Sequence, residues 1–308
     1  MLILLAIATF SGCKRLIPEE KQSISVYATF YPVYALTDAV MRDVPDARLH
    51  CLVQPQDGCL RSYQLSDWDT ALLASGADAV IMGGRGLESF ESALFGWGDA
   101  GPAVSAVLYN LELYNQAEHI DGEAESHLKG PNPHLYMSIS GAKQMVESIS
   151  ATMVSLDPAY AQTYVENTES AIRQLDGLLA ENQGELADYT GRRVVLMNEA
   201  LIYVARDYGL EVADWIDRES GAPMGDNELS ALTERLADDE TRVVLIEKQA
   251  PQALVEALEA AGCVTARIDV MSTHREGEGF DAYLDIQREN ARAIRSAFER
   301  ADSGKEAA

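Results

Sequence analysis

Basic residues are scarce in this chain. Its 24 Lys and Arg stand against 49 Asp and Glu, and the formal net charge is -25 at pH 7. Recognition of a phosphate backbone and adsorption to anionic lipid headgroups both depend on clustered Lys and Arg. The composition therefore argues against a nucleic-acid-binding protein and against charge-driven adsorption to a membrane surface.

Cysteine is also rare, with Cys13, Cys51, Cys59 and Cys263 as the full set. No Cys-x-x-Cys pair occurs, so a structural zinc finger and a thioredoxin-like redox centre are excluded by spacing. In an exported chain, Cys51 and Cys59 are near enough in sequence to close a small disulfide loop. Cys263 is then expected to be an unpaired core residue before a strand.

Motifs of several enzyme classes are missing. The chain has no Gly-x-Ser-x-Gly elbow, no Walker loop and no Gly-x-Gly-x-x-Gly after a strand. Glycines at 83, 84 and 86 follow an apolar stretch, but this turn lacks the Lys-Ser/Thr ending and the third spaced glycine of a phosphate loop. We therefore expect that the protein is not an enzyme.

A short apolar run opens the chain at residues 1–8, and Phe10-Ser11-Gly12-Cys13 follows it. The run is too short to span a bilayer, but its length fits the core of a signal peptide. The segment that ends at Cys13 resembles a lipobox, in which the cysteine becomes the lipid-carrying N-terminus. We expect residues 1–23 to be signal peptide, lipobox and tether, and the mature protein to be extracytoplasmic and lipid-anchored to the cell membrane.

Apolar segments alternate with helical patterns along the rest of the chain. Strands are expected at 24–29, 48–53, 79–82, 104–107, 193–197, 242–246 and 264–268. This alternation predicts an α/β fold with mostly parallel sheets covered by helices. The chain of 308 residues is long enough for two lobes with separate cores.

A long helix is expected between the lobes, from Asp157-Pro158 to about Leu186. Proline is favoured in the first turn of a helix. The apolar residues that recur at helical spacing are Tyr164, Ala171, Leu175, Leu178 and Leu179. The expected organisation is therefore an N-terminal lobe at 24–156, a connecting helix at 157–188 and a C-terminal lobe at 189–308.

Histidine is concentrated in one region. Of five histidines, His119, His127 and His134 fall within sixteen positions. Histidine is common in polar loops, so any one of them is weak evidence for a metal site. His134 stands in the segment Asn132-Pro133-His134-Leu135-Tyr136, however, and other motifs accompany this segment.

The accompanying motifs lie in a fixed order along the chain. They are Phe30-Tyr31-Pro32, Arg61-Ser62-Tyr63, Gly84 to Glu88, Leu156-Asp157-Pro158, Tyr203 to Leu210, Ile268-Asp269 and Tyr283 to Asn290. With the His134 segment, they resemble the metal-binding lipoproteins of ABC importers for zinc and manganese. The resemblance implies two α/β lobes joined by a single long helix. It also implies a solute-binding protein that captures zinc or manganese between the lobes and delivers it to an ABC permease and ATPase.

Members of that family hold the ion with three histidines and an acid for zinc, or with two histidines and two acids for manganese. This difference follows the preference of imidazole for zinc and of carboxylate for manganese. Position by position, the resemblance retains His134 and Asp269. The third ligand falls on Asn198, with Glu199 beside it, so the implied metal residues are His134, Asp269, Asn198 and Glu199.

The first ligand of the family falls on Arg61, two residues before Tyr63, and both residues are expected to line the cleft. A guanidinium has no acceptor atom and a permanent charge, so Arg61 cannot ligate a cation. Within salt-bridge reach of Asp269, it would repel an incoming dication. We expect that the arginine weakens metal binding relative to a histidine.

Two alternatives to this reading remain open. Arg61 and its neighbours would instead bind a small anionic or zwitterionic ligand, or the protein would be a surface adhesion or sensing lipoprotein without a transport role. The metal site itself would also be shifted if other ligands completed it around His134 and Asp269. The candidates for such a shifted site are Cys59, His127, Glu199 and His274.

Overall fold

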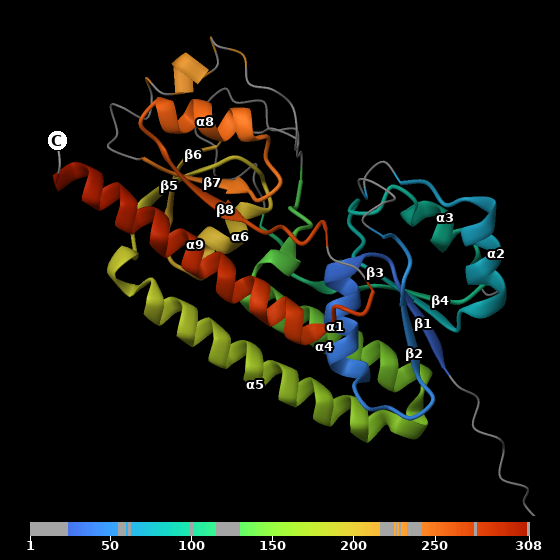
Figure 1. The fold of residues 1–308 in the computed structure, drawn as a ribbon. Helices are drawn as coiled ribbons and strands as arrows, with labels where there is room; N and C mark the ends of the chain where they lie inside the picture. Colours follow the sequence, from blue (N-terminus) through green and yellow to red (C-terminus); the bar gives the residue numbers. More distant parts are fainter. Residues whose placement is uncertain are drawn as a thin grey trace, which may run out of the picture.

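The computed structural model describes residues 24–54, 60, 63–98, 101–114, 130–215, 225, 227, 229–232, 234, 242–273 and 276–306. These residues form two α/β lobes, each built on a parallel sheet, with long helices that run along both lobes (Figure 1). The predicted fold class is therefore confirmed. The predicted domain boundaries remain a prediction.

The N-terminal sheet has the strand order β2-β1-β3-β4, and every pair is parallel. Its strands are β1 (Ser25–Ala28), β2 (Arg48–Cys51), β3 (Ala79–Met82) and β4 (Ala103–Ala106). The helical segments of this lobe are α1 (Tyr31–Met41), α2 (Asp67–Gly76), α3 (Glu91–Phe95) and the 3-10 turn η3 (Val107–Asn110). All four strands were predicted, because each carries a short apolar segment.

The C-terminal sheet has the order β6-β5-β7-β8 and is also parallel. Its strands are β5 (Arg193–Leu196), β6 (Glu211–Trp215), β7 (Val243–Glu247) and β8 (Val264–Ile268). The helical segments η7 (Ala187–Tyr189), α6 (Leu201–Asp207) and α8 (Gln252–Ala260) belong to this lobe. The sequence analysis missed β6, because this edge strand is partly exposed and carries acidic residues at both ends of its short apolar segment.

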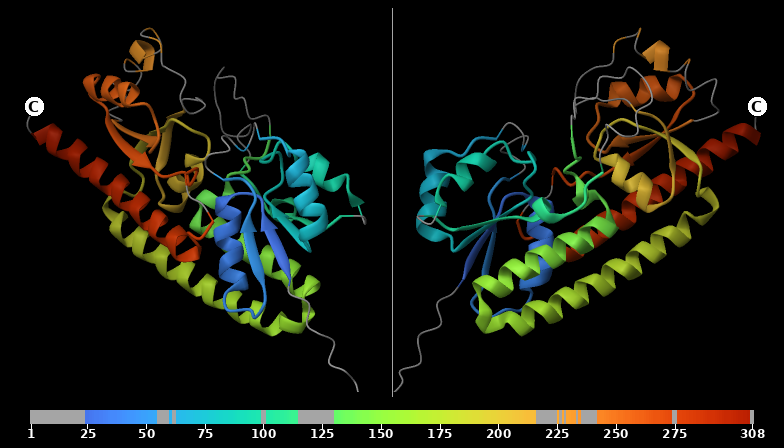
Figure 2. Two further views of the ribbon diagram at one scale, coloured as in Figure 1. Left: turned by 45° about the vertical axis from the view of Figure 1, so that its right-hand side comes forward. Right: turned by 180° about the vertical axis from the view of Figure 1, so that it is seen from behind.

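Helices join the two lobes. They are η5 (Leu135–Met137), α4 (Ile139–Leu156), η6 (Pro158–Tyr160), α5 (Ala161–Glu185) and α9 (Phe280–Glu306). Helix α5 starts beside the N-terminal lobe, runs back along α4 and ends beneath the C-terminal sheet, with α9 alongside it (Figure 2). The predicted connecting helix is thus present, with a 3-10 turn at Pro158 before the α-helix begins at Ala161.

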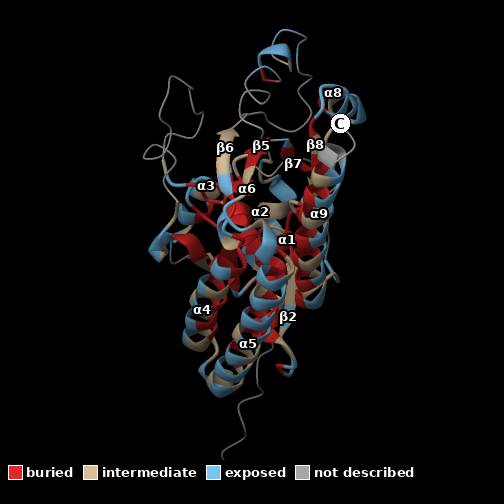
Figure 3. Ribbon diagram, turned by 90° about the vertical axis from the view of Figure 1, so that its left-hand side faces the viewer, coloured by how far each residue is buried: buried red, intermediate tan, exposed pale blue. Residues whose placement is uncertain are grey.

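One face of α5 is buried and the opposite face is polar. Tyr164, Ala171, Leu175 and Leu178 are buried, and Leu179 is partly buried, as the helical spacing predicts. In Figure 3 the exposed residues of α5 lie on its outer side. Across the described ranges, no helix combines the length and the apolar character that crossing a membrane would require.

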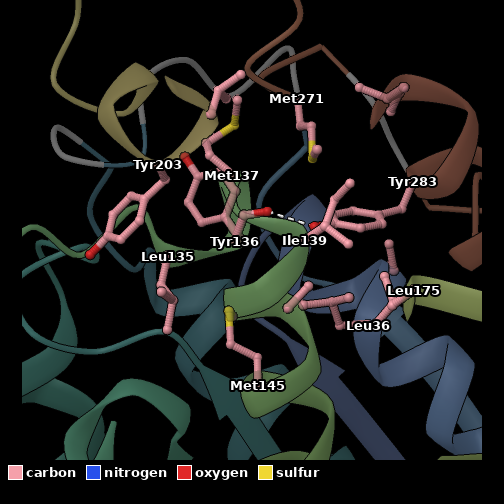
Figure 4. Packing of buried hydrophobic residues seen from close by; sticks show 14 of the residues in the cluster. Leu36, Leu135, Tyr136, Met137, Ile139, Met145, Leu175, Tyr203, Met271 and Tyr283 are labelled. Atoms are coloured by element: carbon pink, nitrogen blue, oxygen red, sulfur yellow. Dashed lines mark hydrogen bonds between the residues drawn. The ribbon is translucent and has the colours of Figure 1, made fainter. Parts of the chain in front are cut away.

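A single hydrophobic core extends through both lobes. In β3, Ala79 and Ile81 face this core, and in β7 Val243 and Leu245 face it. The intervening strand residues belong to separate small clusters on the outer faces of the sheets. Figure 4 shows residues from α1, α4, α5 and α9 meeting in the shared core. The lobes are therefore packed on common helices rather than connected by a flexible linker.

A carboxylate from the C-terminal lobe also holds the start of α4. Ser138 Oγ donates a hydrogen bond to Asp207 Oδ1 at 2.9 Å, and the backbone N–H groups of Ile139 and Ser140 donate to Asp207 Oδ2. Burial raises the pKa of Asp207, while these hydrogen bonds oppose the shift. Because an acid at a helix N-terminus also meets the positive end of the helix dipole, this contact fixes α6 against α4.

Replacing Leu175 with Ala is expected to lower the free energy of unfolding by about 2–5 kcal/mol, because it opens a cavity in the shared core. Leu175 is 0% exposed, whereas Val165 on the same helix is 40% exposed. Val165→Ala is therefore the matched control and should change stability by less than about 0.5 kcal/mol. Urea unfolding of both variants measures the difference, and equal losses would contradict the shared core.

Candidate functional site

His134 lies just before η5, and Asn132 sets the orientation of its ring. The fully buried Asn132 donates from Nδ2 to the Glu199 carbonyl at 2.8 Å, so its Oδ1 is turned toward His134. That oxygen accepts from the His134 backbone N–H at 3.0 Å and lies 2.9 Å from Nδ1. Because Oδ1 can only accept, Nδ1 carries the proton, and in the neutral ring Nε2 presents the lone pair that can bind a cation.

Glu199 lies on the Nδ1 side of the same ring. Its Oε1 is 3.5 Å from His134 Nδ1, and the two side chains are only 12–13% exposed. In this position the carboxylate attracts the Nδ1–H and helps to fix the ring. Nδ1 and Nε2 point in different directions, so in this position Glu199 lies on the side of the ring opposite to the nitrogen that would bind a metal. Its predicted role as a metal ligand remains a prediction.

Asn198 lies in the turn between β5 and α6. Its Nδ2 donates to Glu247 Oε1, and its Oδ1 accepts from the backbone N–H of Ala200 at 2.7 Å. Burial raises the pKa of Glu247, and the hydrogen bond from Asn198 opposes this shift. The amide therefore spans the point between β5 and β7 where the strand order reverses, the usual place for ligands in open parallel sheets.

Asp269 is the first residue after β8, and both its backbone and its side chain are hydrogen-bonded. Asn290 of α9 binds its backbone twice, with the Asp269 N–H donating at 2.8 Å and Asn290 Nδ2 donating to the Asp269 carbonyl at 3.0 Å. In the carboxylate, Oδ1 accepts from the Met271 N–H at 2.8 Å, and Oδ2 accepts from Lys248 Nζ at 3.1 Å. The side chain is 5% exposed, so its charge is buried and paired.

Backbone strain marks the residue that follows this turn. Met271 has φ 66, which is unusual for a non-glycine residue, and it is buried. Strained residues of this kind persist only when the surroundings determine them, and they are common at functional sites. The strain fits a turn whose purpose is to present Asp269.

Helix α9 connects the two predicted metal residues. Tyr283 Oη donates to the carbonyl of Tyr136 at 2.8 Å, in the turn that follows His134 (Figure 4). Gln287 Nε2 donates to the next carbonyl, that of Met137, at 3.2 Å. Asn290 holds Asp269 from the same helix. The predicted motif from Tyr283 to Asn290 thus ties both halves of the site to one rigid element.

Tyr31 brings the N-terminal lobe close to Asp269. Its pKa is raised far above the ordinary range, chiefly by burial and then by the charges of Glu278, Asp269 and Asp38. The Phe30-Tyr31-Pro32 motif therefore places a neutral phenol, with Pro32 opening α1, within electrostatic reach of the Asp269 carboxylate.

The glycine turn after β3 is closed by a buried acid. Glu88 Oε1 accepts from the Gly83 N–H and from Thr29 Oγ1, and Oε2 accepts from the Gly84 N–H, at 2.7–2.8 Å. Gly84 has φ +81, and a Cβ there would lie 2.9 Å from Ala106. Because a carboxylate already takes these amide groups, the turn does not act as a phosphate loop.

Of the other predicted site residues, Tyr63 is described by the structure, whereas the rest lie outside the described part of the chain. Tyr63 donates from its hydroxyl to Asp69 Oδ2 at 2.8 Å, and Asp69 also closes the capping box of α2 with Ser66. Its predicted cleft role remains a prediction. The residues that lie outside the described part of the chain are Cys13, Cys59, Arg61, His119, His127 and His274. The predicted Cys51–Cys59 disulfide and the shifted metal site involve these positions and remain predictions.

Within the described residues, no three His, Cys, Asp or Glu side chains lie close enough together to hold a metal ion. His134, Glu199 and Asp269 therefore do not form a ready-made coordination sphere. The sequence analysis also missed Lys248, which is exposed and carries no motif. Only the pairing of β7 with β8 reveals that it lies beside Asp269.

Comparisons with known proteins show which family and fold the chain resembles. The sequence matches the family described as zinc-uptake complex component A, periplasmic (ZnuA), over residues 26–297. Zinc-binding lipoprotein AdcA of Streptococcus pneumoniae is 23% identical over 284 residues, which cover 88% of this chain and 55% of AdcA. The high-affinity zinc uptake system protein ZnuA of Bacillus subtilis is 22% identical over 311 residues, or 96% of this chain and 94% of ZnuA.

A solved structure gives the same fold. FpvC of Pseudomonas aeruginosa in complex with Mn2+ has a TM-score of 0.76 at 20% identity, covering 91% of this chain and all of FpvC. Because the identity is low, this likeness shows the fold alone. The chain spans only about half the length of AdcA, with 55% of that protein covered.

Replacing Asn290 with Leu should lower the free energy of unfolding by about 1–3 kcal/mol, because the Asp269 N–H and carbonyl would lose their partner in a buried place. The matched control is Glu289→Leu, at an exposed neighbouring position on α9. Urea unfolding followed by circular dichroism measures both variants. A loss at Asn290 no larger than at Glu289 would show that α9 does not hold Asp269.

Proposed function

Because the chain belongs to the ZnuA family of periplasmic zinc-uptake components, we propose that it captures a divalent metal ion, zinc or manganese, between its lobes. Proteins of this family are solute-binding components of metal importers and not enzymes, so the expectation that this chain is not an enzyme is confirmed. In this proposal the metal is the cargo of the protein and not a resident cofactor.

The observation that carries the proposal is the orientation of His134. Asn132 holds Nδ1 as a donor, and the imidazole is left with Nε2 as its metal-binding atom. A buried histidine that only packs in a core needs no such arrangement from a fully buried amide. The carboxylate of Asp269 supplies the negative charge that a cation requires, and the oxygens of Asn198 and Glu199 remain the further proposed ligands.

The donor set suits both proposed ions. Imidazole nitrogen suits zinc, whereas carboxylate and carbonyl oxygens suit manganese. One histidine with one or two carboxylates and an amide oxygen lies between these preferences. With two of the family's four ligand positions changed, we expect weak binding and little discrimination between the two ions.

The family also suggests which partners receive the metal ion and where in the cell the protein lies. The family provides the substrate-binding components of metal ABC importers, and we propose an ABC permease and its ATPase as the partners of this chain. Homologues include lipoproteins and periplasmic proteins, and we propose that Cys13 carries the lipid that holds the mature protein at the cell membrane. No contact within the described residues favours an anionic ligand at Arg61 or an adhesive role.

Calorimetric titration with zinc and with manganese tests the site. His134→Ala should abolish the binding that the native protein shows, because it removes the oriented nitrogen. His50→Ala is the matched control, since His50 is a histidine on β2 that pairs with Glu276 and not with Asn132. Tight binding that survives His134→Ala would show that the metal lies elsewhere.

The same titration measures the effect of Arg61. Like charges at 4 Å repel by about 4 kcal/mol per unit pair at an effective dielectric of 20, which corresponds to several powers of ten in affinity. Arg61→His should therefore bind the ions more tightly than the native protein. Equal affinities would show that the arginine does not face the cation.

Lipid anchoring is tested by cell fractionation. Cys13→Ala should move the protein from the membrane fraction to the soluble fraction, because the acceptor thiol is lost. Cys263→Ala is the control, since Cys263 is buried next to β8 and carries no lipobox. Membrane association that is unchanged in Cys13→Ala would contradict the proposed anchor.

A further inference from the structure

Lys248 and Asp269 are placed side by side by the register of two parallel strands. The last pair in the ladder of β7 and β8 is Glu247 with Ile268, so the next residue of each strand is Lys248 and Asp269. The Lys248 N–H continues the ladder and donates to the Ile268 carbonyl at 2.8 Å. The closeness of the two residues is therefore a consequence of strand pairing and not of a chance side-chain conformation.

The backbone of Lys248 is fixed from both sides, while its side chain is not. Arg267 Nη1 donates to the Lys248 carbonyl at 3.3 Å, and Arg267 also contacts Gln252. The Lys248 side chain is 54% exposed, and its ammonium still lies 3.1 Å from Asp269 Oδ2, whose residue is only 5% exposed. A flexible, strongly hydrated cation is thus tethered at the open side of a buried carboxylate.

The two oxygens of Asp269 differ in how they are held. Oδ1 accepts from the N–H of Met271 inside a tight turn, and the backbone of Met271 is strained. Oδ2 accepts from the half-exposed lysine. An ion that approaches Oδ2 therefore meets the ammonium of Lys248.

We propose that Lys248 is a built-in competitor for the cargo, a tethered cation that must leave Asp269 Oδ2 before a metal ion binds there. This inference rests on the proposed function, since it concerns the same site. The competition lowers the affinity for the ion, and the ammonium returns to the carboxylate as the ion departs. Lys248 is then an affinity-determining residue whose effect is exerted through Asp269.

A purely structural role explains the arrangement less well. The lysine end of the pair is half-exposed, so solvent screens the ammonium, and holding the long side chain in place costs rotamer freedom. A buried carboxylate near a cation site, by contrast, is costly without a counter-charge. A mobile lysine supplies that charge when the ion is absent and withdraws to solvent at small cost when the ion is present.

The test is calorimetric titration of Lys248→Gln with zinc chloride and manganese chloride. Removal of the competing charge should tighten binding at least about tenfold relative to the native protein. Lys248→Arg keeps the charge and should keep the native affinity. The matched control is Lys143→Gln, which removes a partly exposed ion pair with Asp176 between α4 and α5 and should leave the affinity unchanged.

A double-mutant cycle ties the effect to the proposed contact. In an Asp269→Asn background, Lys248→Gln should no longer tighten binding, because the oxygen for which the lysine competes has lost its charge. A tenfold gain that persists in this background would overturn the inference, since the lysine would then act by general electrostatics.

The remaining outcomes separate this inference from the proposed function. If His134→Ala abolishes binding while Lys248→Gln binds as the native protein does, the inference is wrong and the proposed function stands. If neither the native protein, nor Arg61→His, nor Lys248→Gln binds either ion, the proposed function fails and the inference fails with it.

Discussion

The site depends on a stripe of buried polar side chains along α9. Tyr283, Gln287 and Asn290 are spaced four and three residues apart, so they lie on one face of the helix. All three are at most 2% exposed. Polar groups in such a place destabilise the fold unless they are hydrogen-bonded. The Tyr283 hydroxyl and the side-chain N–H groups of Gln287 and Asn290 donate to the turn after His134 and to the backbone of Asp269. One rigid helix therefore sets both halves of the site.

The same packing limits how the lobes can move. Both sheets face a shared core, and Asp207 of the C-terminal lobe holds the start of α4. The segment after Asp269 is tied to the N-terminal lobe as well, where Glu276 accepts from the Cys51 N–H and Asp38 accepts from the Phe280 N–H. A Cβ at Gly279 would lie 2.3 Å from Asp38, so only glycine allows this approach. Cargo entry is therefore expected to depend on side chains such as Lys248 more than on hinge opening.

Much of the fold could be predicted from the sequence because its determinants are local. Strands such as β3 and β7 are continuous apolar segments, and most of the buried residues of α5 are apolar and recur at helical spacing. Strand β6 was missed because acidic residues flank its short apolar segment. Among the site residues, His134 and Asp269 were found through motifs, and the hydrogen bonds of Asn132 and Asn290 now give physical reasons for those motifs.

Contacts that depend on strand register could not be predicted in this way. The sequence analysis placed the positive charge of Arg61 beside Asp269, and that prediction concerns a residue outside the described part of the chain. The described residues add the charge of Lys248, which lies 21 residues from Asp269 in the chain and which no motif indicated. Likewise, Asn198 was predicted as a metal ligand, and the structure adds that its amide binds Glu247 and the backbone of Ala200. The parallel pairing of β5, β7 and β8 decides which side chains become neighbours at the ends of these strands.

The central claim is that α9 presents His134 and Asp269 to one cation. Anomalous diffraction from crystals grown with zinc, collected on both sides of the zinc absorption edge, tests it most directly. The account predicts an anomalous peak about 2 Å from both His134 Nε2 and the Asp269 carboxylate. A peak at another cluster, such as His50 with Glu276, together with no peak at His134, would contradict it.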